Sequence, residues 1–198
     1  MTSIQLNLFM QRFIKDLQKY NGVEPQSVKA KNDFVFCKTL FGNEKVDYTC
    51  VMELLNDAIF TKNELELDLL LMLLSHFNCV NHYCITLSQL LIQPWHHFHD
   101  RIASMLEFDA DERIIENLRQ AAVYRCDNLE YQSDYYEFNR KCLFALARIG
   151  TQDAIKSIKD VSGVDDSIIA NHALEVMKQY NLRQGTKTGD KTGDGSMS

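Results

Sequence analysis

The sequence predicts an all-α protein. The chain has 198 residues, of which 45% are hydrophobic, and a chain of this size can bury roughly 70% of its surface as one ordinary domain. Glycine and proline are scarce, with eight and two residues, and four of the glycines fall in the last fourteen positions. Apolar residues recur at spacings of three and four, the period of amphipathic helices. We therefore expect about ten helices, arranged as antiparallel pairs because their connections are short.

Five helices are expected in the first half of the chain, each ending at a helix-breaking residue or where its apolar period stops. Their approximate ranges are 4–21, 25–42, 51–58, 63–77 and 83–92. The fourth is apolar on nearly every side, which predicts a central helix that is buried from two directions.

Five more helices are expected in the second half, over residues 98–107, 111–125, 134–149, 151–161 and 165–180. Gly150 is expected to end one of them and Thr151 to cap the start of the next. Residues 185–198 contain a single apolar residue, Met197. We therefore predict a single all-α domain over residues 1–184 and a flexible Gly/Thr/Lys/Asp tail over residues 185–198.

The apolar positions of residues 102–118 recur forty residues later, which predicts two consecutive helix-turn-helix repeats. The matching positions are Ile102 and Cys142, Leu106 and Leu146, Ile115 and Ile155, and Leu118 and Ile158. The segment ALARIGTQDAIKSIKDV, residues 145–161, resembles the HEAT-like repeat of the phycobilisome-lyase type. The resemblance covers residues 137–180 and, more loosely, 98–125. It implies a short α-solenoid of stacked helix pairs with an exposed curved face, and no particular activity.

The charge balance argues against several classes of partner. The net charge is −6, from 21 basic and 27 acidic residues, whereas nucleic acids and anionic membranes recruit basic side chains.

Residues 1–7 lack the features of a secretory signal, and the most apolar stretch, 65–74, is too short to span a bilayer. Six cysteines occur without a CxxC motif. We expect them to be reduced and mostly buried, in a cytoplasmic protein.

Two stretches contain residue types that bind metals. His76 to Cys84 reads H-x2-C-x2-H-x-C, but zinc sites usually pair two ligand groups across a longer loop, so buried thiols and interhelix contacts are the preferred interpretation. WHHFHD, residues 95–100, resembles the signature of HD-domain phosphohydrolases, in which histidines and aspartates hold a metal that activates water. A well-placed distal aspartate is missing, and Asp100 also suits a helix start. We expect no metal, cofactor or small-molecule substrate, and the phosphohydrolase stays an alternative.

The sequence contains no nucleophile elbow, phosphate-binding loop or dinucleotide fingerprint. We therefore expect no catalytic residues. A chain of stacked helix pairs without such motifs more often works by presenting a surface to a partner.

Acidic residues are concentrated between residues 105 and 137, where nine acids face three arginines; this excess of six equals the net negative charge of the whole chain. Residues 127–137, DNLEYQSDYYE, mix acids with tyrosines, a composition common at protein interfaces. The alternative is that Tyr135 or Tyr136 packs into the core and the acids are solvated. The candidate partner-binding residues are Glu107, Asp109, Asp111, Glu112, Asp127, Glu130, Tyr131, Asp134, Tyr135, Tyr136 and Glu137.

WHHFHDRIAS, the acidic helix pair after it and EYQSDYYEFNRKCLFALARIGT together resemble the HEAT-like immunity proteins of bacterial contact-dependent growth inhibition. The resemblance implies a cytoplasmic protein that binds one cognate basic toxin domain, such as a nuclease, and blocks it without catalysis. Carboxylates suit that role because they imitate the phosphates that a nuclease binds. A generic HEAT-like scaffold or regulator with another protein partner is the alternative.

Overall fold

The structure, a computed structural model, describes residues 48–76, 80–109, 111–125 and 132–189. In these ranges it contains eight α-helices, two short 3-10 helices and no strand. The all-α prediction is confirmed for this part of the chain. The helices expected over residues 4–21 and 25–42 lie outside the described residues, as do residues 190–198.

The chain divides into two compact units, Met1–Tyr83 and Cys84–Ser198. In the first unit a tight turn joins α3 (Tyr48–Thr61) to α4 (Glu64–His76), and the 3-10 helix η1 (Val80–His82) follows. Lys62 adopts a left-handed φ of 53°, and the amide of Asn63 donates to the carbonyl of Ala58 at 2.9 Å, which closes α3. The Asn63 side chain accepts from the amide of Glu66 at 3.3 Å and so caps α4.

Helix α4 is buried on almost every side, as its apolar density predicts. Six of its seven leucines expose 6% of their surface or less: Leu67, Leu69, Leu70, Leu71, Leu73 and Leu74. Successive positions around a helix point in different directions, so this helix has neighbours on several faces.

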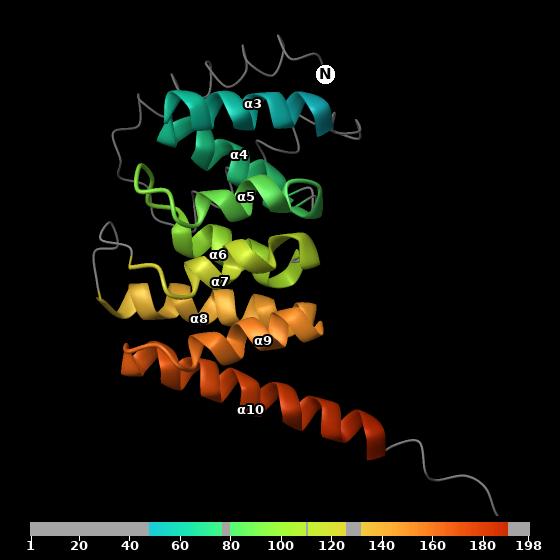
Figure 1. Ribbon diagram of the computed structural model, residues 1–198. Helices are drawn as coiled ribbons and strands as arrows, with labels where there is room; N and C mark the ends of the chain where they lie inside the picture. The colour runs from blue at the N-terminus through green and yellow to red at the C-terminus, as the bar shows by residue number, and fades with distance from the viewer. Residues whose placement is uncertain (1–47, 77–79, 110, 126–131, 190–198) are drawn as a thin grey trace, which may run out of the picture. The chain divides into compact units, whose positions relative to one another are not determined.

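The described part of the second unit forms the α-helices α5 to α10 (Figure 1). They are α5 (Cys84–Leu90), α6 (His99–Asp109), α7 (Ile115–Ala121), α8 (Gln132–Ile149), α9 (Gln152–Val161) and α10 (Ser167–Gly189). The helix expected over residues 111–125 is instead the 3-10 turn η2 (Glu112–Ile114) followed by the shorter α7. Helix α10 runs through residues 185–189, the first part of the expected tail. A glycine lowers the stability of a helix but does not by itself end it, so the helix continues past Gly185.

Helices α6 and α8 lie side by side and run in the same direction. Asp100 at the start of α6 pairs with Lys141 in the middle of α8, and at the ends of both helices the Arg148 guanidinium lies 4.5 Å from the centre of the Phe108 ring. Both pairs are separated by about the forty residues of the sequence repeat. Corresponding positions of the two repeat units therefore contact each other.

Helix α10 continues this order next to α8. The Tyr136 hydroxyl donates to Asp166 at 3.4 Å near the two helix starts, and the Tyr180 hydroxyl donates to the carbonyl of Gly150 at 3.2 Å beyond the end of α8. Helices α6, α8 and α10 therefore share one direction. Six of the eight residues that match in the repeat are fully buried: Ile102, Leu106, Leu118, Cys142, Leu146 and Ile158.

Several local predictions are confirmed. Gly150 has a φ of +66° and its amide donates to the carbonyl of Leu146, as expected for a residue that ends α8. The Thr151 hydroxyl accepts from the amide of Ala154 at 3.3 Å and caps α9. Cys84 and Cys142 are free and buried.

Within the described residues, none of the helices is both long and apolar enough to cross a membrane.

Candidate functional site

The structure places only part of the expected acidic, tyrosine-rich surface. Asp127, Glu130 and Tyr131 lie outside the described residues, and the side chain of Asp134 is also not described. The remaining candidates fall into two groups. One lies around the end of α6 and η2: Glu107, Asp109, Asp111 and Glu112. The other lies near the start of α8: Tyr135, Tyr136 and Glu137.

These two groups lie at opposite ends of α6. The beginning of α6 lies beside the middle of α8, as the Asp100–Lys141 ion pair shows, so the start of α8 lies beyond the beginning of α6, whereas the first group is at the far end of α6. Helix α6 has 11 residues and is therefore about 16 Å long. These candidate residues therefore form two separate groups, because parallel stacking of α6 and α8 separates groups that are close in sequence.

The group on α8 mainly holds α8 in place. Tyr135 exposes only 8% of its surface, and burial, with the nearby Asp166 carboxylate, raises the pKa of its phenol. Tyr136 is half-buried and donates to Asp166. Glu137 pairs with Arg140 at 3.1 Å. For Tyr135 the structure shows the alternative weighed above, a tyrosine packed into the core, so Tyr135 offers little surface to a partner.

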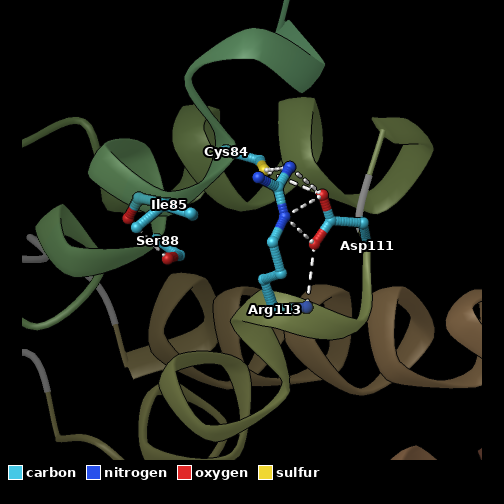
Figure 2. Close-up of polar contacts among 5 residues, drawn as sticks. All are labelled: Cys84, Ile85, Ser88, Asp111 and Arg113. Carbon is cyan, nitrogen blue, oxygen red and sulfur yellow. Dashed lines mark hydrogen bonds and ion pairs between the residues drawn. The ribbon is translucent and has the colours of Figure 1, made fainter.

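Asp111 joins η2 to α5 (Figure 2). One of its oxygens accepts from the backbone amide of Arg113 at 2.8 Å, and the other accepts from the Cys84 thiol at 3.3 Å. Hydrogen bonds from the Arg113 guanidinium hold the pKa of Asp111 at about 2. Burial, and then the hydrogen bond to Asp111, raises the pKa of the Cys84 thiol. Cys84 therefore remains a protonated structural thiol rather than an activated nucleophile.

Glu107, Asp109 and Glu112 differ from the other acids of this end. No ion pair involves them among the described residues, whereas Asp111 and Glu116 are held by neighbouring arginines. Glu112 is exposed and the other two are half-exposed.

The position of Glu107 and Asp109 opposes helix stability. Both lie in the last turn of α6, which carries no basic residue. The partial negative charge at a helix C-terminus disfavours carboxylates there. Folding therefore does not account for these two residues.

Phe108 stands between these two acids and is 65% exposed. The Arg148 guanidinium lies 4.5 Å from its ring centre, so the ring already takes part in a cation–π contact. Phe108 is not among the interface residues that the sequence predicts. Its signal was an apolar residue flanked by two acids, outside the buried stripe of Ile102 and Leu106. We call Glu107, Phe108, Asp109 and Glu112 the α6–η2 surface.

The histidine stretch forms a buried joint between α5 and α6. The His96 and His99 rings are fully buried and stack with centres 4.4 Å apart. Nδ1 of His96 accepts from the amide of Phe98, so Nε2 carries the proton that it donates to the carbonyl of Leu90 at 3.1 Å. Nδ1 of His99 pairs with the carbonyl of Leu91 at 3.1 Å and is therefore the protonated nitrogen.

The adjacent Asp100 is directed elsewhere, toward Lys141 on α8. His99 and Asp100 therefore do not converge on a common point, as the ligands of an HD-type site must. The described residues contain no group of three or more His, Cys, Asp or Glu side chains that could hold a metal ion. This part of the structure gives the phosphohydrolase alternative no support.

Comparisons of the chain with protein-family models, with curated proteins and with solved structures find no match. The α6–η2 surface is therefore the main structural guide to function.

Proposed function

We propose that this protein is an immunity protein that binds a cognate basic toxin domain and neutralises it without catalysis in the bacterial cytoplasm. One observation carries the proposal: the exposed Phe108 lies between Glu107 and Asp109 in the chain, and these two carboxylates and Glu112 make no ion pair among the described residues. Two of them lie where the helix dipole opposes them. Residues that are unfavourable for folding and exposed to solvent are best explained by contact with a partner.

The chemistry of the α6–η2 surface suits a cationic partner. Uncompensated carboxylates attract lysine and arginine, raise association rates and reject acidic proteins. Phe108 supplies an aromatic anchor, the residue class enriched at interfaces. A nuclease domain fits this description because its own substrate-binding surface is basic.

The proposed scaffold is a short HEAT-like solenoid. The shared direction of α6, α8 and α10 and the forty-residue offset of the contacts between α6 and α8 support this architecture. With helices at 4–21 and 25–42, the chain would have the expected ten helices. A generic HEAT-like regulator of another basic protein would use the same surface, and the partner's identity separates the two proposals.

The test compares two variants that each remove one negative charge, Glu112→Gln on the α6–η2 surface and Glu137→Gln at the start of α8. Binding is measured by calorimetry against the basic domain encoded by the neighbouring reading frame, at low and high salt. We expect Glu112→Gln to weaken binding about threefold to tenfold at low salt and less at high salt. Glu137→Gln should bind like the unaltered chain.

Phe108→Ala removes the proposed anchor and should weaken binding at least tenfold at both salt concentrations, about 1.4 kcal/mol or more. A larger loss in Glu137→Gln than in Glu112→Gln would move the contact to α8. If the chain neither binds the basic domain nor protects cells that produce it, the immunity function is wrong. Binding to a different basic protein would support the regulator instead.

A further inference from the structure

The last helix of the second unit carries apolar residues on two opposite faces. On the inner face Ile169, Ala173 and Val176 expose 2% or less of their surface. On the outer face Ile168, Leu174 and Leu182 expose 43%, 54% and 63%. A helix that is apolar on both faces is normally covered on both.

The exposed residues of α10 form one stripe. Ile168, Glu175 and Leu182 are seven residues apart, two helical turns, and therefore lie in line. Lys178 lies three residues after this line's central Glu175, and Leu174 lies four residues before Lys178, so both lie beside the line on the same outer face. The stripe from Ile168 to Leu182 is about 21 Å long.

The charges of this outer face are mixed. Glu175 and Lys178 are both exposed and make no ion pair with each other among the described residues; Glu175 accepts only a 3.4 Å hydrogen bond from Gln179. When two copies of this face meet with their helices antiparallel, the acid of each copy can lie opposite the base of the other. It lacks the uncompensated negative charge that would select a basic partner.

The chain's own C-terminal end is a poor cover for this stripe. Residues 185–198 contain one apolar residue, Met197, so they can bury little apolar surface against three aliphatic side chains. A second copy of the chain brings both the aliphatic residues and the opposite charges.

We propose that α10 binds α10 of a second copy in an antiparallel, two-fold symmetric contact. With the axis midway between Glu175 and Lys178, each Glu175 meets Lys178 of the other copy. Leu174 then inserts into the space bounded by Glu175, Lys178, Gln179 and Leu182 of the other helix, in the manner of a knob in a hole. Contact through a single helix pair is smaller than a standard interface, so the dissociation constant should be on the order of micromolar or weaker.

The first experiment is sedimentation velocity of the full chain over a series from low micromolar to several hundred micromolar. We expect a monomer–dimer equilibrium that shifts with concentration. Leu174→Asp should remove the dimer at every concentration. Val123→Asp, which places the same charge at another exposed aliphatic position, should leave the dimer intact. Circular dichroism shows that both variants retain their helices.

The second experiment tests the register by charge exchange. Glu175→Lys and Lys178→Glu each bring like charges together and should each weaken self-association at least tenfold at low salt. Mixing these two variants restores both ion pairs in a heterodimer, as does the double variant in a homodimer. If the unaltered chain is monomeric at every concentration of the series, the proposal is wrong, even if another molecule covers this face of α10. A dimer that persists in Leu174→Asp, or whose charge variants show no rescue on mixing, overturns the α10 contact.

Discussion

At the scale of single residues, the main electrostatic feature of the second unit is a pair of neutral histidines in the core. Burial, and then the neighbouring His99 ring, lowers the pKa of His96 to about 4. Burial also lowers the pKa of His99. Nε2 of His99 and the side-chain oxygen of Asn139 are buried without a hydrogen-bond partner in the described part of the structure.

Acid should therefore destabilise the protein through His96. The unfolded chain takes up a proton near pH 6.5, whereas the folded protein resists protonation down to about pH 4. The unfolded state thus binds more protons between these values, and the free energy of unfolding falls by about 3 kcal/mol as the pH drops through this window. Urea unfolding at a series of pH values measures this loss. His96→Gln should flatten the curve, and a curve of equal slope in that variant would contradict the assignment.

Gly150 is the second feature at this scale. Its φ of +66° is left-handed, and a Cβ there would meet its nearest neighbours at an ordinary 3.6 Å. The cost of Gly150→Ala is therefore conformational and should be about 1 kcal/mol. Gly163→Ala is the control, because a Cβ at Gly163 also meets its neighbour at 3.6 Å and no left-handed φ is required. Chemical denaturation should show a loss for Gly150→Ala alone; equal losses would mean that packing dominates.

At the scale of elements, α9 shows how a local pattern places a helix. Its buried residues Ala154, Ser157, Ile158 and Val161 follow the three-and-four spacing of one helical face. Gly150 and Thr151 separate α9 from α8 within two residues. A short connection of this kind makes the two helices antiparallel neighbours.

The cap of α9 can be tested at one position. Thr151→Ala removes the oxygen that accepts from the amide of Ala154 and should lower the free energy of unfolding by about 1 kcal/mol. Thr151→Ser keeps the oxygen and should retain most of the stability. Thermal unfolding of the three proteins gives the comparison. If Ser and Ala cost the same, the hydroxyl has no capping role.

At the scale of the whole molecule, the chain consists of two compact units that meet at residues 83 and 84 in the sequence. In the second unit, ion pairs and ring contacts between α6 and α8 match the forty-residue repeat.

This division predicts that residues 84–198 fold without residues 1–83. The isolated segment should show helical circular dichroism and a cooperative urea transition, because its core is built largely from its own helices. A segment without a cooperative transition would show that the first unit is required for the second to fold.

Much of the described fold could be predicted because its signals are local. Helices α3 to α10 follow from apolar periodicity, and the junction at Gly150 and Thr151 follows from cap chemistry.

The candidate site was less predictable. Tyr135 and Glu112 both lie in an acidic stretch, yet one is buried and the other exposed. Their environments depend on which helix packs beside them, and that information is not local.

The sequence alone determined the all-α class, the repeat and most helix bounds, since backbone hydrogen bonds and apolar stripes act over a few residues. Tertiary structure decided which acids are free to meet a partner. Parallel stacking of α6 and α8 put Glu112 and Glu137 at opposite ends, packing of η2 against α5 brought Asp111 to the Cys84 thiol, and Phe108 was left exposed. Charge and exposure depend on neighbours in space, and only packing brings those neighbours together.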